Sequence, residues 1–230
     1  MEREAVILAG GLGTRLREVV DDIPKSMAPV NGKPFLEYVL NRLIEYRFNR
    51  IILATGYKNE AISSYFGDHH GEASLIYSME KEPLGTGGAI FLASSQVTSD
   101  YFFVLNGDTL FSVDLDAMED FSRKEKAVIT VALKPMADFD RYGSVSLEGD
   151  RIVSFNEKKF CNSGLINGGI YFVNKRWFRL NATTEKFSFE KDILEKGTSY
   201  DLIAGYISDS YFIDIGIPGD YFRALKDLTI

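Results

Sequence analysis

Residues 5–11 read Ala5-Val6-Ile7-Leu8-Ala9-Gly10-Gly11, a short apolar run that ends in two glycines. A continuous run of this length is typical of a strand that is buried on both faces of a parallel sheet. Arg50-Ile51-Ile52-Leu53-Ala54 is a second run of the same kind, and Gly56 follows it closely. The two runs therefore predict buried strands of one α/β sheet.

Strand-like and helix-like segments alternate through the first half of the chain. Pro34 opens a segment whose apolar residues, from Leu36 to Phe48, recur at helical spacing. The sequence then predicts a strand over residues 74–77, a helix over residues 87–97 and a strand over residues 101–105. This β-α-β-α order indicates a doubly wound, mostly parallel sheet.

The pattern changes after about residue 127. A strand is predicted over residues 127–133, and two further apolar segments flank Glu148-Gly149-Asp150, which has the composition of a hairpin turn. Strands are also predicted over residues 169–173 and near residues 211–213, and helices over residues 175–180 and from residue 218 or 219 onward. No linker or repeat interrupts the pattern, so these strands are predicted to join the same sheet, as a mixed sheet within a single domain over residues 1–230.

The composition limits the classes of partner. The net charge of −7 over 230 residues argues against a nucleic-acid-binding protein, whose binding surface would be basic. A single cysteine, Cys161, excludes an internal disulfide framework and a thiolate zinc cluster. The residues after Met1 do not resemble a signal peptide, and no apolar stretch approaches the roughly 20 residues of a membrane helix. We therefore expect a cytoplasmic protein that has neither a membrane nor a nucleic acid as its partner.

The glycines that follow the first strand predict a phosphate nearby. Gly10, Gly11 and Gly13 let the backbone approach a charged ligand closely, so that consecutive N–H groups converge on phosphate oxygens. The dinucleotide pattern G-x-G-x-x-G fails because Leu16 occupies its third glycine position, and no Gly-Lys-Ser or Gly-Lys-Thr follows to make a P-loop. A purely structural glycine turn remains the alternative.

Two cations follow this turn. Arg15 carries a fixed fork of donors that suits phosphate oxygens, whereas Lys25 carries a compact point charge. A reaction that activates a triphosphate needs one cation on the departing pyrophosphate and another on the phosphoryl group that is transferred. Arg15 and Lys25 are candidates for these two roles, and a pair of solvated surface residues is the alternative.

Two distant aspartates are candidates for a shared metal. Asp108 lies in Asn106-Gly107-Asp108, directly after a predicted strand, where α/β sheets bind their ligands. Asp214 lies between Ile213 and Ile215, where a carboxylate is costly to bury without a partner. Mg²⁺ takes one or two carboxylates together with substrate phosphate oxygens. The alternatives are a turn role for Asp108 and a helix-capping role for Asp214.

The glycine turn and the segment around Lys25 together resemble the signature of the sugar-1-phosphate nucleotidyltransferases. The matching stretches are Leu8-Ala9-Gly10-Gly11-Leu12-Gly13-Thr14-Arg15-Leu16 and Pro24-Lys25-Ser26-Met27-Ala28-Pro29-Val30. Members of this family attach a nucleoside monophosphate to a sugar 1-phosphate. Ser26 departs from the pattern, since relatives often carry a proline there. The resemblance implies a Rossmann-like nucleotidyltransferase fold, with a nucleotide-binding half over about residues 1–126 and a sugar-phosphate-binding half over about residues 127–230.

The resemblance also implies roles on the nucleotide side. Asp108 and Asp214 match the motifs that hold the catalytic magnesium, and Arg15, Lys25 and Asp108 match the catalytic positions. Glu80 is our first choice for the contact with the base and Glu82 our second, although Glu80-Lys81-Glu82 also has the composition of an exposed loop. The implied nucleotide-binding residues are Leu8, Ala9, Gly10, Gly11, Gly13, Thr14, Arg15, Lys25, Glu80, Pro83, Gly85, Thr86 and Asp108. As an alternative, Thr86 is a good candidate for a helix N-cap.

On the acceptor side, Asn156-Glu157-Lys158 and Asn167-Gly168-Gly169 resemble the family's sugar motifs. By this resemblance Lys158 binds the phosphate of the sugar 1-phosphate. The other implied sugar-binding residues are Gly143, Glu157, Asn167 and Gly168. A polar strand end or hairpin is the alternative.

The chemistry of the family needs no general base. A sugar 1-phosphate is largely dianionic near neutral pH, because its second pKa is about 6. One of its oxygens can attack the α-phosphorus of a nucleoside triphosphate in line, and catalysis then rests on positioning and on neutralising charge.

Among the family, the chain most resembles the short guanylyltransferases that act on D-glycero-α-D-manno-heptose 1-phosphate. This resemblance implies GTP as substrate, Mg²⁺ as cofactor and a GDP-heptose product for bacterial surface polysaccharide such as capsule. Three alternatives stay open: mannose 1-phosphate with GTP, glucose 1-phosphate with UTP or dTTP, and a non-catalytic homologue that senses nucleotide-sugars. A dehydrogenase is disfavoured by the missing third glycine. Phe160 and Trp177-Phe178 are candidates for a homodimer face, although such residues are more often core.

Overall fold

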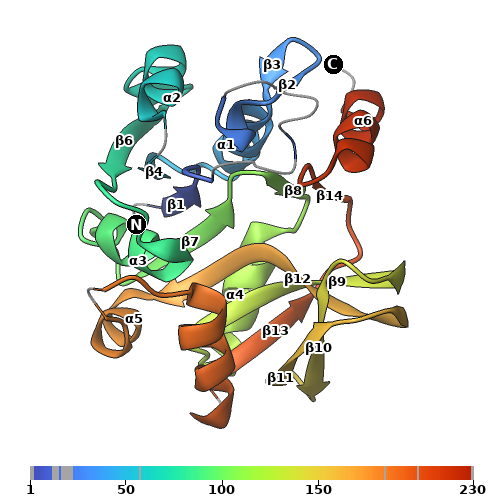
Figure 1. Cartoon of the computed structure of the whole chain (residues 1–230). Helices are drawn as coiled ribbons and strands as arrows, with labels where there is room; N and C mark the ends of the chain where they lie inside the picture. The colour runs from blue at the N-terminus through green and yellow to red at the C-terminus, as the bar shows by residue number, and fades with distance from the viewer. Residues whose placement is uncertain are drawn as a thin grey trace.

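The chain forms a ten-stranded mixed sheet (Figure 1). Its neighbouring strands follow the order β10-β11-β13-β9-β12-β7-β1-β4-β6-β5. The computed structural model describes residues 3–11, 16, 23–56, 58–183, 185–200 and 202–228. The α/β class and the mixed sheet that the sequence predicts are confirmed, because helices alternate with strands and the sheet contains both parallel and antiparallel pairs.

The first half of the sheet consists of parallel strands with apolar runs. They are β1 (Glu4–Leu8), β4 (Arg50–Thr55), β6 (Ala73–Met79) and β7 (Tyr101–Asn106). β4 and then β6 lie on one side of β1, whereas β7 lies on the other side. The order of strands therefore reverses between β1 and β7, and open α/β sheets bind ligands at the carboxyl ends of the strands at such a point.

The strands of the second half extend this sheet, and most of their pairings are antiparallel. They are β9 (Ile129–Phe139), β10 (Gly143–Glu148), β11 (Arg151–Lys158), β12 (Cys161–Asn174) and β13 (Ile203–Ile207). β12 pairs with both β7 and β9, and so it joins the two halves of the chain. The predicted hairpin between β10 and β11 is confirmed, and its turn contains Gly149 in the left-handed region. β13 has no counterpart among the predicted strands.

Helices cover both faces of the sheet, because alternate side chains of each buried strand point to opposite faces. Ile7 faces one core, to which a first group of four helices contributes residues. Val6 faces a second core, to which a second group of three helices contributes. The first group is α1 (Phe35–Glu45), α2 (Asn59–Phe66), α4 (Leu115–Glu125) and α6 (Pro218–Asp227). The second group is α3 (Gly85–Ala93), α5 (Lys175–Asn181) and the π-helix η2 (Phe189–Glu195).

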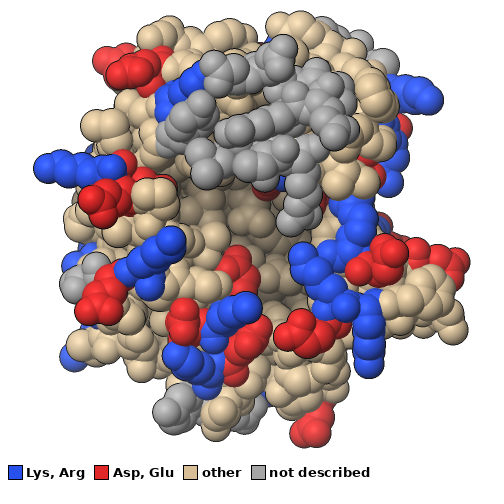
Figure 2. All heavy atoms as spheres, viewed as in Figure 1, with Lys and Arg blue, Asp and Glu red and all other residues tan. Residues whose placement is uncertain are grey.

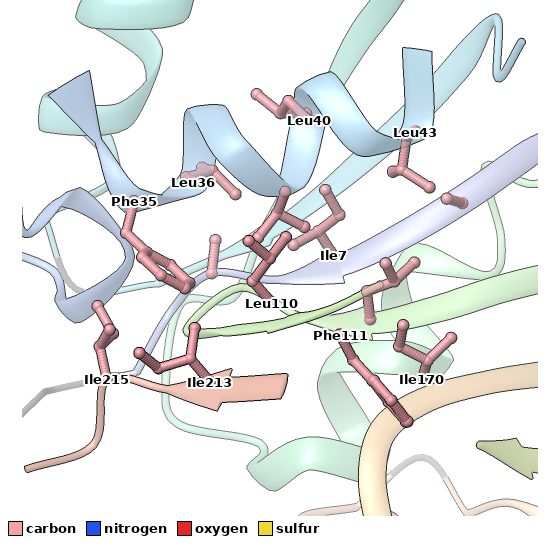
Figure 3. Close-up of a cluster of buried hydrophobic side chains, with 14 of the residues drawn as sticks. Ile7, Phe35, Leu36, Leu40, Leu43, Leu110, Phe111, Ile170, Ile213 and Ile215 are labelled. Carbon is pink, nitrogen blue, oxygen red and sulfur yellow. The ribbon is translucent and has the colours of Figure 1, made fainter. Parts of the chain in front are cut away.

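The predicted stripe of apolar residues on α1 packs against the sheet. Phe35, Leu36, Leu40 and Leu43 are fully buried. Figure 3 shows Phe35 and Leu43 directed from α1 toward the strands below it, where Ile7, Leu110 and Ile213 lie, whereas Leu40 points away from Ile7. The burial of this stripe explains why hydrophobic periodicity was enough to predict α1. Neither α2 nor α4 was predicted, although Asp114 caps α4 by accepting from two backbone N–H groups.

The remaining elements are short. They are η1 (Lys25–Met27), η3 (Thr198–Tyr200), β2 (Pro29–Val30), β3 (Lys33–Pro34), β5 (His69–His70), β8 (Thr109–Phe111) and β14 (Phe212–Asp214). β8 and β14 pair with each other outside the main sheet, so the prediction that the strand near residues 211–213 joins this sheet is wrong.

Two candidates for a dimer face differ in burial. Phe178 belongs to the core of the α3 side, whereas Phe160 is 64% exposed at the tip between β11 and β12. Among the described residues, no helix is both long enough and apolar enough to span a membrane.

Candidate active site

The site lies where β1 and β7 end side by side. Leu8 pairs with Asn106 in the parallel register, and the N–H of Gly107 donates to the carbonyl of Leu8 at 2.9 Å. The glycine turn therefore leaves the sheet next to Asp108. Figure 2 shows that this face of the molecule is hollowed, with Lys and Arg side chains on both sides of the hollow.

Two cavities meet at these strand ends. The β1–α3 cavity has a volume of about 390 Å³, and the β12–β14 cavity has a volume of about 460 Å³. The β1–α3 cavity is lined by Leu8, Gly10, Gly11, Ala54, Glu80, Pro83, Gly85, Thr86, Ala89, Asn106, Asp108 and Glu190. The β12–β14 cavity is lined by Gly11, Lys25, Asn106, Asp108, Thr109, Arg141, Tyr142, Lys158, Asn167, Gly168, Gly169, Tyr171, Glu190, Phe212, Asp214, Gly216 and Ile217.

Lys25, Asp108 and Asp214 form one ionic cluster in the β12–β14 cavity. The β8–β14 pairing sets Asp214 opposite Thr109, which is the neighbour of Asp108. Lys25 Nζ, from η1, donates to Asp108 Oδ2 and lies 3.3 Å from Asp214 Oδ1. The three side chains are only 15–32% exposed. A candidate cation and both candidate metal ligands therefore converge at one point.

The Asp214 carboxylate is held by further donors. The N–H of Gly216 donates to Asp214 Oδ1 at 2.8 Å, and the hydroxyl of Tyr142 donates to Oδ2 at 3.4 Å. Burial, and next the charge of Asp214, raises the pKa of Tyr142, so this hydroxyl keeps its proton. The helix-capping alternative for Asp214 is wrong, because the N-cap of α6 is Ile217.

The donor set of this cluster fits a magnesium ion. Two carboxylates converge on a single cationic group, and oxygen ligands are the ones that Mg²⁺ prefers. Among the described residues, no group of three or more His, Cys, Asp or Glu side chains is arranged for a metal. An ion held here would therefore take its other ligands from substrate phosphate or water.

Glu80 is positioned on the wall of the β1–α3 cavity. Its Oε2 accepts from the N–H of Leu84 at 2.9 Å, while its Oε1 lies against Gly56. A Cβ atom on Gly56 would lie 2.8 Å from this oxygen, so the carboxylate occupies space that only glycine leaves free. Glu82 is exposed and is not among the residues that line either cavity.

Thr86 has a different role from the one expected of an N-cap. α3 begins at Gly85 with Leu84 as its N-cap, so the capping alternative for Thr86 is wrong. The Thr86 hydroxyl donates to Glu190 Oε2 at 2.7 Å and accepts from the N–H of Phe189 at 2.9 Å. It therefore links α3 to η2, although Thr86 also lines the β1–α3 cavity.

A β-bulge in β12 orients Asn167 in the β12–β14 cavity. The register with β9 shifts between Asn167 and Tyr171. Asn167 Oδ1 accepts from the N–H of Gly169 at 3.0 Å, and Asn167 Nδ2 donates to the Tyr171 hydroxyl at 3.0 Å. Burial raises the pKa of Tyr171, which is therefore protonated and able to donate.

The expected sugar-side residues do not all meet in this cavity. Lys158, Asn167 and Gly168 line it. Glu157 is exposed and Gly143 is half-buried, and neither is among the lining residues. On the nucleotide side, Ala9 is buried behind Gly10 and Gly11. Gly13, Thr14 and Arg15 lie outside the residues that the structure describes.

Two charged residues at the site were not predicted. Arg141 lines the β12–β14 cavity, forms an ion pair with Asp220 and donates to the Tyr142 hydroxyl at 2.9 Å. The one sequence signal for Arg141 was its position two residues before Gly143, which was predicted to bind the sugar. Glu190 lines both cavities, and no sequence motif marked it.

Comparison with known proteins shows the family of the chain. The chain matches the nucleotidyl transferase family over residues 4–229, and it belongs to this family. Two relatives are D-glycero-alpha-D-manno-heptose 1-phosphate guanylyltransferases. The protein from Aneurinibacillus thermoaerophilus is 50% identical over 98% of both chains. The protein from Campylobacter jejuni is 48% identical over 96% of this chain and 98% of its own length.

A solved structure of similar size has the same fold. HddC from Yersinia pseudotuberculosis, in complex with GMP-PN, superposes with a TM-score of 0.88 at 36% identity, over 99% of this chain and all of that one. The UTP-bound UGPase from Acinetobacter baumannii superposes with a TM-score of 0.84 at 24% identity, over 99% of this chain and 93% of that one, which supports the fold alone.

Proposed function

We propose that this chain transfers GMP from GTP to D-glycero-α-D-manno-heptose 1-phosphate and releases pyrophosphate. The observation that carries the proposal is the junction of two cavities at Asp108, beside the Lys25 ammonium group. Two reactants that bind on either side of this junction would meet at a cation. Such positioning is the main requirement of phosphoryl chemistry that needs no general base.

The choice of GTP and heptose rests on the relatives. Both guanylyltransferases described above are similar to this chain over nearly their full lengths, and HddC was crystallised with a guanine nucleotide analogue. Glu80 supports the same choice. A carboxylate can accept from both N1–H and N2–H₂ of guanine, whereas uracil and thymine offer only N3–H.

In the proposed reaction, an oxygen of the sugar phosphate attacks the α-phosphorus of GTP. The bond between the α-phosphorus and the bridging oxygen of the β-phosphate breaks, and this oxygen leaves with pyrophosphate. Lys25 offsets charge on the reacting phosphates, Lys158 holds the phosphate of the acceptor, and Arg15 is assigned to the leaving pyrophosphate. Gly10, Gly11 and Gly13 supply backbone donors to the triphosphate.

Asp108 and Asp214 would hold Mg²⁺, which would supply charge neutralisation at the phosphate oxygens. Lys25 bridges the two carboxylates in this structure. The flexible Lys25 side chain would then be available to the phosphates, because its ammonium group is a mobile point charge. We assign the reaction to the cytoplasm, where nucleoside triphosphates are available, and the product to the supply of activated heptose for surface polysaccharide.

The test is a substrate panel. The protein is incubated with Mg²⁺, each of the four nucleoside triphosphates and a set of sugar 1-phosphates, and pyrophosphate release is measured. We expect the highest kcat/KM for GTP with the heptose 1-phosphate. A preference for mannose 1-phosphate, or for UTP or dTTP with glucose 1-phosphate, would replace this assignment within the same family. Binding of a nucleotide-sugar without turnover of any pair would instead favour a regulatory role.

A further inference from the structure

Glu190 stands at the boundary between the two cavities. Only Gly11, Asn106, Asp108 and Glu190 line both of them among the described residues. Asn106 ends β7, and Gly11 and Asp108 follow β1 and β7 closely, whereas Glu190 comes from η2. The residue is therefore in reach of a ligand that extends from one cavity into the other.

One oxygen of this carboxylate is fully engaged. Oε2 accepts from the Thr86 hydroxyl at 2.7 Å and from the Ser188 hydroxyl at 2.9 Å. Thr86 in turn accepts from the N–H of Phe189, so its proton is directed at the carboxylate. The other oxygen, Oε1, has no donor among the described residues. Glu190 thus presents a fixed acceptor that is free to take a hydrogen bond from a ligand.

The surrounding backbone keeps η2 in place against α3. Phe187 accepts from the N–H of Gly87 at 3.1 Å through its carbonyl and donates to the carbonyl of Leu84 at 3.0 Å through its N–H. Ser188 caps η2 by accepting from the N–H of Lys191. An acceptor that is held this rigidly favours ligands with a donor at one particular position.

The charge of Glu190 indicates which part of a ligand it contacts. A carboxylate repels phosphate but accepts strongly from hydroxyl groups. Lys25, Lys158 and Arg141 provide the cations of the β12–β14 cavity, which suit phosphate. Asn167 and the Tyr171 hydroxyl are neutral groups that line the same cavity as Glu190, and they suit the hydroxyls of a sugar.

We infer that Glu190 is a specificity-determining residue that accepts a hydrogen bond from a hydroxyl of the acceptor sugar, with Thr86 as the residue that positions it. The inference rests on the proposed function, because it requires a sugar 1-phosphate in the β12–β14 cavity. It also assigns Thr86 to the sugar side of the reaction, through Glu190, although Thr86 belongs to the motif of the nucleotide side.

The experiment compares Glu190→Gln with Glu195→Gln. Both substitutions make the same chemical change on η2, but Glu195 is exposed and lines neither cavity. We expect Glu190→Gln to lower kcat/KM for the preferred sugar 1-phosphate about 10- to 100-fold through a higher KM, with the KM for GTP unchanged. Glu195→Gln should behave as wild type. Thr86→Val, which lacks the hydroxyl, should raise the KM for the sugar 1-phosphate as Glu190→Gln does. Thr86→Ser, which keeps the hydroxyl, should have a KM close to that of wild type. A thermal unfolding scan checks that each variant folds.

A panel of monodeoxy sugar 1-phosphates identifies the hydroxyl. Wild type should discriminate against one analogue at least about tenfold, and Glu190→Gln should lose that discrimination. An unchanged KM for the sugar phosphate, or a defect confined to GTP, would overturn the inference. The panel is run on whichever sugar 1-phosphate wild type prefers, so a wrong heptose assignment leaves this test intact. If wild type neither binds nor converts any sugar 1-phosphate, both the inference and the proposed function fail.

Discussion

Asp108 and Asp214 contact the same lysine although they lie in distant parts of the chain. Residue type alone left each of them with a structural alternative, and the capping alternative for Asp214 is now removed. Their assignment to Mg²⁺ stays a prediction. The geometry makes it specific, because both carboxylates contact the Lys25 ammonium group in the β12–β14 cavity, and Asp108 also lines the β1–α3 cavity.

Asp108→Asn should lower kcat about 100-fold or more and raise the Mg²⁺ concentration that half-saturates the enzyme. The amide carries no charge and is a much weaker ligand for a hard cation. Asp120→Asn, an exposed position on α4, is the matched control. Steady-state rates over a Mg²⁺ titration measure the effect, and wild-type Mg²⁺ dependence in Asp108→Asn would rule out the metal assignment.

Glu80→Gln tests recognition of the base. It should lower kcat/KM with GTP about 10- to 100-fold and with UTP much less, since guanine loses a carboxylate that accepts two hydrogen bonds. Glu82→Gln removes a charge two residues away on an exposed side chain and serves as the control. Competition between GTP and UTP at equal concentrations reads out the change, and equal losses for both nucleotides would remove Glu80 from base recognition.

At the scale of elements, α3 and η2 pack against each other. Both elements line the β1–α3 cavity, and η2 also lines the β12–β14 cavity through Glu190. α3 was predicted over residues 87–97, so its predicted start is two residues late and its predicted end four residues late. η2 was not predicted, and nothing in its short sequence indicates that it packs on α3. Gly87 is essential to this contact, since a Cβ atom there would lie 2.2 Å from the ring of Phe187.

Gly87→Ala should therefore destabilise the protein by about 1–3 kcal/mol, because the Phe187 ring must move away from α3. The same change should also raise the KM for the sugar 1-phosphate, since η2 carries Glu190. Gly219→Ala in the first turn of α6, where a Cβ atom meets only Ile217 at 4.0 Å, is the control and should not destabilise. Urea unfolding gives the stabilities, and equal stability of Gly87→Ala and wild type would contradict the close packing of Phe187 on α3.

At the scale of the whole molecule, the sheet is continuous across the two expected halves. β12 pairs with β7 of the first half along five residues, and β14 pairs with β8. α6 also contacts the first half, where the Tyr221 hydroxyl donates to the carbonyl of Pro29 at 2.6 Å. The predicted division near residue 126 is therefore not a boundary in the core.

A fragment of residues 1–126 should accordingly fail to fold cooperatively. Without β12, the apolar strand β7 becomes an exposed edge, and unpaired edges of this kind aggregate. The full chain should unfold in a single transition by circular dichroism and by intrinsic fluorescence. A sharp urea transition in the soluble fragment would instead show that the nucleotide-binding half is an independent domain.

Most of the fold followed from local patterns. Buried parallel strands are continuous apolar runs, and α1 carries a clear helical stripe, so both were predicted close to their observed bounds. α2 and α4 were missed because their periodicity is short or largely polar. β13 was missed because Ile203–Ile207 includes a glycine and lacks a distinctive pattern. The order of strands could not be predicted, since pairing across the sheet leaves little trace in local sequence.

The sequence by itself determined three features of this protein. They are the glycine run at Gly10 and Gly11, its position after a buried strand, and the order of the family motifs. These features depend on neighbours in the chain, where backbone conformation and hydrophobic period are local properties. Only the tertiary structure decided which side chains face one another. The convergence of Lys25, Asp108 and Asp214 depends on the β8–β14 pairing, and the bond between Thr86 and Glu190 depends on the packing of α3 against η2. Contacts of this kind arise from the summed burial of distant apolar surfaces, so no single segment encodes them.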